Sequence, residues 1–150
     1  MVSRSDCLKR YGSDYYIRKK LAAGELFRVD KGIYSEKENV PELALIAYKY
    51  PNAVVTMETA FYLYDLTDEI PDEYSVATKR EAAPITDLRV KQYFVPKEIL
   101  RLGETVFDYK GYLIPIYDRE RMLVELVRYK PKLPYNYYKE ILRNYRRILP

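Results

Sequence analysis

The opening stretch, residues 1–34 (MVSRSDCLKRYGSDYYIRKKLAAGELFRVDKGIY), decides the fold that we expect for this chain. It holds eight Lys or Arg against four acids, a net charge of +4 that equals the net charge of the whole chain. Residues 35–150 therefore carry no net charge. A small basic segment ahead of a neutral body is typical of a DNA-binding head attached to a separate domain.

Two short helices are predicted in this stretch. Gly12 ends the first, and Gly24 marks the boundary of the second, which spans residues 14–23. Ser13 or Asp14 can cap the second helix, because such side chains accept hydrogen bonds from its first backbone N–H groups. Two helices separated by so short a turn match the helix-turn-helix pattern.

A β-hairpin is predicted directly after these helices. Residues 25–29 and 32–35 form two short runs around the turn at residues 30–32 (DKG), which suits a tight hairpin. A helix-turn-helix followed by a hairpin is a winged helix, so we expect an N-terminal winged helix-turn-helix head over residues 1–35. The helix that usually precedes this motif is missing or very short here.

The remaining residues, 36–150, predict helices and strands in alternation. Strands that are bracketed by helices and include a local hairpin favour the α+β class, with a mixed α/β body, over a parallel doubly wound sheet. Helices are expected at residues 40–50, 58–66, 118–129 and 135–148, and strands at residues 53–56, 74–78, 88–95, 105–110 and 112–117.

The second helix has the residue types of a DNA-recognition helix. At 100° per residue, Ile17 and Leu21 point to the core, whereas Tyr15, Tyr16 and Lys19 lie on the opposite face. A helix in the major groove needs small or planar groups at its early exposed positions. We therefore expect these two tyrosines and this lysine to meet base edges.

Cations on both sides of that face complete the predicted DNA-binding set. Arg18 and Lys20 flank it and would reach phosphates, while Arg28 and Lys31 on the wing could clamp the adjacent backbone. The helix N-terminus, at Ser13, also favours phosphate. The alternative is a solvated basic helix face beside a structural hairpin, since Lys and Arg are common on such faces.

Residue types that are absent exclude several functions. The chain has no His, which removes His general bases, Cys-His nucleophile pairs and His-ligated zinc. Cys7 is the only cysteine, so no intrachain disulfide can form, which fits a reducing cytoplasm. The sequence has no apolar run near 18 residues and no leader pattern, so we expect a cytoplasmic protein without membrane contact. We expect no enzyme, no catalytic residues and no cofactor.

Two charge patterns in the body invite other interpretations. A cluster of acids near the centre of the chain could suggest a metal site, but these residues surround a helix end and a turn, so we expect solvated charges and no metal. Residues 35–118 carry a net charge of −6 and residues 119–150 a net charge of +6, blocks that can pack together, bind a partner or extend the DNA-binding face. The acids of the cluster are Asp65, Asp68, Glu69, Asp72 and Glu73.

Three stretches of the chain resemble the AbiEi-like antitoxins of bacterial type IV toxin–antitoxin (abortive infection) systems. Residues 13–35 (SDYYIRKKLAAGELFRVDKGIYS) are similar to the recognition helix and wing of that family. Residues 56–80 (TMETAFYLYDLTDEIPDEYSVATKR) and 114–128 (IPIYDRERMLVELVR) resemble segments of its antitoxin domain. The chain departs from the family in lacking a full first helix and in ending soon after Arg147.

The resemblance implies a function as well as a fold. Members of the family have a winged-helix head that represses their own operon and a C-terminal domain, here residues 36–150, that is needed to neutralise a nucleotidyltransferase-like toxin. When the family's DNA-contacting positions are carried over to this chain, they fall on residues already described. The family has no catalytic residues to carry over. The DNA-contacting positions are Tyr15, Tyr16, Arg18, Lys19, Arg28 and Lys31.

The partners expected on this basis are double-stranded DNA from the chain's own promoter and the toxin, with direct contact to the toxin left open. An inverted-repeat operator would imply two heads on one site, so a dimer on DNA also stays open. The rival hypothesis is a non-catalytic protein-interaction module whose opposed charge blocks recognise a partner and whose basic head is incidental.

Overall fold

The structure, a computed structural model, describes residues 1–148 and contains both helices and strands, so the predicted α+β class is confirmed. The chain divides into two compact units between Lys49 and Tyr50. This division lies later than the boundary that the sequence suggested after residue 35, because helix α3 (Glu42–Lys49) counts with the first unit.

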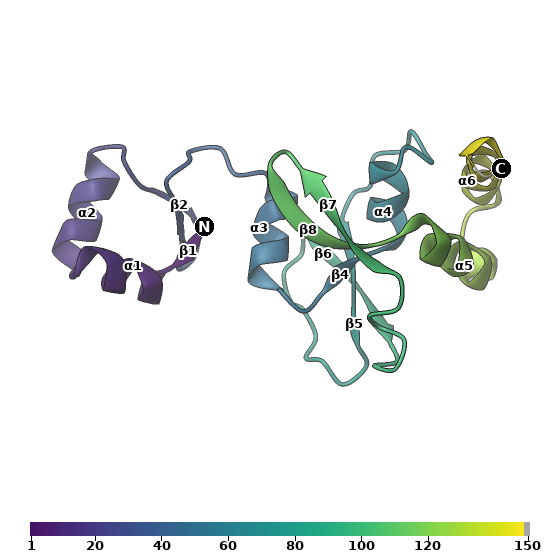
Figure 1. The fold of residues 1–150 in the computed structure, drawn as a ribbon, viewed down its shortest axis with the longest axis horizontal. Helices are drawn as coiled ribbons and strands as arrows, with labels where there is room; N and C mark the ends of the chain where they lie inside the picture. The colour runs from purple at the N-terminus through teal and green to yellow at the C-terminus, as the bar shows by residue number, and fades with distance from the viewer. Residues whose placement is uncertain (149–150) are drawn as a thin grey trace. The chain divides into compact units, whose positions relative to one another are not determined.

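The first unit contains a small antiparallel sheet and three helices, two of which, α1 and α2, precede α3 (Figure 1). Its strands follow the order β1-β3-β2, so the first strand of the chain pairs with the second strand of the hairpin. The elements that precede α3 are β1 (Val2–Ser3), α1 (Arg4–Tyr11), α2 (Asp14–Ala22), β2 (Phe27–Asp30) and β3 (Ile33–Ser35).

Capping residues bound helix α1, which ends at Gly12 as the sequence predicted. Ser3 caps α1, since its Oγ accepts a hydrogen bond from the Asp6 backbone N–H at 3.1 Å. Gly12, with a φ of 88°, ends α1, and its N–H donates to the carbonyl of Leu8 at 2.9 Å. Helix α2 ends at Ala22, one residue earlier than predicted.

The strand β1 was missed by the sequence analysis because two residues are too few to give a periodic pattern. In the structure Val2 pairs with Tyr34 and Ser3 with Ile33, which adds a third strand to the hairpin. The hairpin itself starts later than predicted, with β2 beginning at Phe27 instead of residue 25.

A small apolar core joins the elements of the first unit. Cys7 of α1, Ile17 of α2, Leu26 and Tyr34 of β3 are each no more than 5% exposed, and they pack together. Leu21 lies against this cluster and is partly buried, so the predicted inward face of α2 is confirmed. Each helix is thereby fixed to the sheet through one fully buried side chain.

The second unit is built on a mixed five-stranded sheet of order β6-β5-β4-β8-β7. The pairs β5–β6 and β4–β8 are parallel, whereas β4–β5 and β7–β8 are antiparallel. The strands are β4 (Val54–Val55), β5 (Tyr74–Lys79), β6 (Val90–Val95), β7 (Glu104–Tyr109) and β8 (Tyr112–Tyr117).

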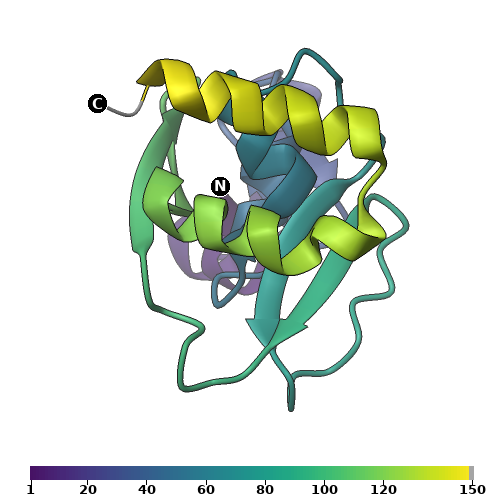
Figure 2. The ribbon, with the colours of Figure 1, turned by 90° about the vertical axis from the view of Figure 1, so that its right-hand side faces the viewer.

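Three α-helices of this unit pack together: α4 (Met57–Leu63), α5 (Arg119–Tyr129) and α6 (Tyr135–Ile148). Figure 2 shows α5 in light green and α6 in yellow running side by side, with α4 behind them. Phe61 of α4 meets Tyr137 of α6 edge to face, and the Tyr145 hydroxyl of α6 donates to the Arg119 carbonyl of α5 at 2.9 Å. A short 3₁₀ turn, η1 (Lys130–Lys132), connects α5 and α6.

Three predicted elements of this unit are clearly shorter than expected, among them β4, which covers only Val54–Val55 of the predicted residues 53–56. Helix α4 stops at Leu63 instead of residue 66, because Asp65 adopts a left-handed φ of 57° and Leu66 N–H bonds back to the Phe61 carbonyl at 2.9 Å. Such a closing pattern ends many helices. Strand β6 starts at Val90 instead of residue 88, and Leu88 is 93% exposed.

Candidate nucleic-acid interface

Helix α2 exposes the face that the sequence predicted would meet DNA. Tyr15 is 67% exposed and Tyr16 is 53% exposed, and their rings contact each other edge to face with centroids 5.3 Å apart. Lys19 is also exposed, whereas Ile17 between them is only 2% exposed. The buried Ile17 therefore orients α2 so that planar and cationic groups point outward.

Four of the predicted cations have no acidic partner in the part of the chain that the structure describes. Arg18, Lys19, Arg28 and Lys31 are exposed and form no ion pair or side-chain hydrogen bond with any of residues 1–148. Exposed cations that are not already neutralised keep their full attraction for phosphate. This set therefore has the charge that a duplex surface requires.

Lys20 differs from those four cations. Its Nζ donates to Glu25 Oε2 at 2.7 Å, an interaction that raises the pKa of Lys20 and lowers the pKa of Glu25. A phosphate would have to compete with this carboxylate, so of the two flanking cations of α2 Arg18 is the one that is ready to bind.

The N-terminus of α2 carries an acidic side chain, Asp14, which does not favour a bound phosphate. Ser13 occupies the N-cap position with extended backbone, yet its hydroxyl makes no capping hydrogen bond. Asp14, in the first turn, forms an ion pair with Arg4 of α1. The Ser13 hydroxyl is thus available to a ligand, while the Asp14 carboxylate already complements the positive end of the helix dipole.

The hairpin presents its two cations from a well-defined turn. Gly32 has a φ of 70°, as expected for a residue chosen to allow the left-handed turn. The Lys31 backbone N–H donates to Asp30 Oδ1 at 2.7 Å, and Ile33, after the turn, is buried. Arg28 lies in β2 opposite Tyr34 of β3. Because Tyr34 and Ile17 share one core, the hairpin and α2 are parts of one rigid arrangement.

The acidic cluster of the second unit does not converge on one point. Within residues 1–148, no group of three or more Asp, Glu or Cys side chains is placed to hold a metal ion. Asp65 lies at the end of α4, while Glu69, Asp72 and Glu73 belong to the loop before β5. These loop acids instead line a cleft beside Glu58, a residue that the sequence analysis did not single out.

No helix within the described residues 1–148 has both the length and the apolar character needed to cross a bilayer. Comparison with known proteins adds no assignment, since no protein-family model and no curated protein matches this chain.

Proposed function

We propose that this chain is a DNA-binding antitoxin, which represses its own operon and counteracts a nucleotidyltransferase-like toxin. The observation that supports DNA binding best is the outward face of α2, where exposed Tyr15 and Tyr16 lie beside Arg18 and Lys19, which have no acidic partner among residues 1–148. A face made only for solvation would gain nothing from two exposed aromatic rings, whereas planar groups can stack on or hydrogen-bond to bases.

The arrangement of the first unit also supports a winged helix-turn-helix head. Helices α1 and α2 are separated only by Gly12 and Ser13, and the β2–β3 hairpin follows α2 directly. In this assignment α2 is the recognition helix and the hairpin is the wing. Within the described residues, the strand β1 is the element that precedes the motif.

Each predicted residue then has a role in the complex. Tyr15, Tyr16 and Lys19 face base edges, while Arg18 contacts phosphate beside them. On the wing, Arg28 and Lys31 contact the neighbouring backbone, and Ser13 and Lys20 complete the phosphate contacts, the latter after exchange with Glu25. Affinity should fall with salt by about one unit of log–log slope for each phosphate contact.

The antitoxin half of the proposal rests on the family resemblance of residues 56–80 and 114–128. Those stretches form α4 with the loop and β5 that follow it, and β8 with α5. The toxin is the functional partner, whether or not the two proteins touch. An operator with an inverted repeat would place two heads on one site.

A gel-shift titration of the DNA upstream of the chain's own reading frame tests the DNA-binding half. We expect salt-dependent binding that weakens at least about tenfold in the double variant Arg18→Ala/Lys19→Ala. The matched control Arg80→Ala/Lys97→Ala removes the same charge from exposed positions of the second unit and should leave affinity within about threefold. Unchanged binding by the α2 variant would remove this helix from the mechanism.

Co-expression tests the antitoxin half separately. The chain is expressed with the nucleotidyltransferase-like protein of the adjacent reading frame, and growth is compared with expression of the toxin alone. Restored growth with the full chain is the expected result. If growth stays arrested although both proteins are shown to be expressed, the antitoxin half of the proposal fails and only the repressor half remains.

A further inference from the structure

A cleft in the second unit combines carboxylates with apolar walls. One hollow, of about 160 Å³, is lined by four acids and by Lys91, and a second, of about 140 Å³, has walls of Pro71, Leu133, Pro134 and Tyr137. Both hollows include Glu58, Glu69 and Pro71, so they adjoin, and together they are called the Glu58 cleft. It brings together α4, the loop before β5, the strands β5 and β6, and the start of α6.

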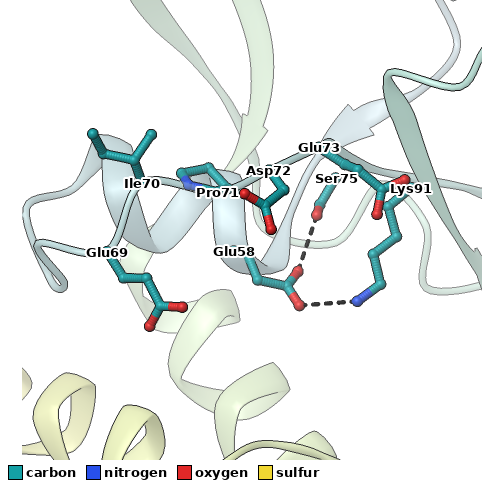
Figure 3. A pocket seen from close by; sticks show the side chains of 8 residues that line it. All are labelled: Glu58, Glu69, Ile70, Pro71, Asp72, Glu73, Ser75 and Lys91. Atoms are coloured by element: carbon teal, nitrogen blue, oxygen red, sulfur yellow. Dashed lines mark hydrogen bonds and ion pairs between the residues drawn. The ribbon is translucent and has the colours of Figure 1, made fainter.

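Glu58 is the fixed negative charge of this cleft. Its carboxylate accepts hydrogen bonds from Ser75 Oγ at 2.9 Å, Lys91 Nζ at 3.1 Å and the Tyr93 hydroxyl at 2.9 and 3.0 Å (Figure 3 draws the first two). Burial raises the pKa of Glu58, but the hydrogen bonds from its own backbone, Lys91 and Tyr93 outweigh burial and hold the pKa below its ordinary value. The carboxylate is ionised, and its own hydrogen-bonding capacity is used within the protein.

Other groups in the cleft have no side-chain partner among residues 1–148. The Tyr137 side chain is only 9% exposed, and its hydroxyl makes no hydrogen bond with any of residues 1–148. The hydroxyl is not among the fully buried unpaired atoms of these residues, so it is an accessible hydrogen-bonding group that no protein partner occupies, in a side chain that lines the cleft. The Glu69 and Asp72 carboxylates are likewise unpaired among the described residues, and in Figure 3 Glu69 lies on the side of Glu58 away from Lys91.

The charge and the apolar surface of the residues that line the cleft indicate which kind of ligand it can bind. Four carboxylates against one ammonium give the first hollow a net charge of −3, which excludes phosphates and favours a cation. The Tyr137 ring and the two prolines offer flat apolar surface, against which a planar guanidinium stacks better than a compact ammonium. Each hollow holds a side chain rather than a nucleotide. Ile70, which is 72% exposed at the edge, is placed to contact the surface from which that side chain projects.

We propose that the Glu58 cleft binds the guanidinium group of an arginine side chain presented by a partner protein. Glu69 and the Tyr137 hydroxyl are the direct acceptors, and Glu58 is a positioning residue that supplies a fixed charge. This surface is distinct from the α2 face and does not depend on DNA binding, since all of its residues belong to the second unit.

The test is an NMR titration of the full chain with blocked amino acids, with the Tyr137 ring signal assigned by Tyr137→Phe. N-acetyl-arginine N-methylamide should shift this signal in a saturable way. The neutral isostere N-acetyl-citrulline N-methylamide should bind at least about tenfold more weakly, and the lysine analogue should fall between the two. Equal binding of the arginine and citrulline probes, or no shift of Tyr137, would overturn the proposal.

Variants identify the contacts. Glu69→Gln and Tyr137→Phe should each weaken the arginine probe at least about fivefold, while Glu98→Gln, which removes an exposed acid outside the cleft, should not. Because the Tyr137 hydroxyl has no partner among residues 1–148, Tyr137→Phe keeps the ring contact with Phe61 and should leave the melting temperature unchanged. Full affinity in Glu69→Gln or in Tyr137→Phe would show that the probe binds elsewhere.

Two further measurements distinguish this proposal from binding of a small molecule and from the proposed DNA binding. If free arginine binds tenfold more tightly than the blocked probe, the ligand is a small molecule and the assignment to a partner protein fails. The arginine probe should bind equally to the Arg18→Ala/Lys19→Ala variant, and Glu69→Gln should still shift promoter DNA. Loss of DNA binding by this cleft variant would contradict the independence of the two surfaces.

Discussion

The helices α2 and α5 both contain several arginines or lysines, yet they use them in opposite ways. In α2, Arg18 and Lys19 are exposed and have no acidic partner within residues 1–148. In α5, Arg121 is only 7% exposed and is surrounded by partners. The same residue type is therefore available to a ligand where it is exposed and unpaired, and stabilises the fold where it is enclosed.

The enclosed guanidinium of Arg121 connects α5 to the segment before β7. Its Nε donates to Glu125 Oε1 at 3.1 Å, and its Nη1 donates to the carbonyls of Ile99 and Leu102, both at 2.6 Å. The cation also lies 4.2 Å from the centre of the Tyr117 ring. Within the described residues Nη2 is the one buried side-chain N or O atom that lacks a hydrogen bond, and the ring contact of the guanidinium compensates for part of this loss.

The close packing around Arg121 requires a glycine beside it. A Cβ added to Gly103 would lie 2.6 Å from the Cβ of Arg121, and Gly103 has a φ of 79°, which other residues rarely adopt. The segment before β7 and the helix α5 are therefore fitted to each other at this point.

The largest effect is expected from Arg121→Met. Removing the cation leaves Glu125 buried without its main partner, because Arg128 is 3.7 Å away and partly exposed, and it also leaves two carbonyls unpaired. Breaking a buried ion pair in this way costs about 3–5 kcal/mol of unfolding free energy. Urea unfolding followed by circular dichroism measures the loss.

The double variant Arg121→Met/Glu125→Leu is the control for this prediction. It replaces both charges with apolar groups and should recover much of the lost stability, since no unpaired charge then remains. If Arg121→Met alone lowers the unfolding free energy by less than about 1 kcal/mol, the enclosed cation contributes no more to stability than the exposed cations of α2.

A smaller effect is expected at alkaline pH from Tyr117, which lies under Arg121. Burial raises the pKa of Tyr117 to about 12, and its hydroxyl donates to the Leu100 carbonyl at 2.6 Å. A pKa raised in the folded state gives stability that is complete below the unfolded value near 10 and is lost as pH rises from there to about 12.

Tyr117→Phe removes this titration. Unfolding measurements between pH 9 and 12 should therefore show a shallower loss of stability in the variant than in the unchanged chain, by up to about 2–3 kcal/mol at the upper end. Parallel curves would show that Tyr117 titrates in the same range in the folded and the unfolded chain.

The smallest effect on stability is expected from the α2 variant Arg18→Ala/Lys19→Ala. Both side chains are exposed and unpaired within the described part of the chain, so their removal should change the unfolding free energy by no more than about 0.5 kcal/mol. The slope of log affinity against log salt for promoter DNA should decrease by about one to two units in the same variant. A large loss of stability would instead mean that these cations belong to the fold.

Local signals in the sequence predicted much of the secondary structure. The bounds of β8 and α6 match the prediction, and Ser13, Gly24 and Gly32 placed α2 and the hairpin to within about two residues. These features depend on neighbouring residues, for example Asp118, whose Oδ1 caps α5 by accepting from Arg121 N–H at 2.8 Å. Capping and turn chemistry can be recognised without knowledge of the tertiary fold.

Features that depend on distant residues could not be predicted in the same way. The order of the mixed sheet joins strands that are far apart in the chain, such as β4 and β8. Arg121 resembles a surface residue at the start of an amphipathic helix, and only its tertiary contacts make it structural. Likewise, Glu58, Ser75 and Tyr93 come from three elements, so no spacing along the chain could have indicated their network.

The buried thiol of Cys7 can be used to detect opening of the first unit. The side chain is completely enclosed between the helices and the sheet, and burial raises the pKa of its thiol, so little reactive thiolate exists while the unit is closed. An alkylating reagent such as iodoacetamide therefore modifies the chain mainly through molecules whose helices have separated from the sheet. Comparing alkylation rates with and without promoter DNA would therefore test whether the proposed complex keeps this unit closed, with no substitution and no added label.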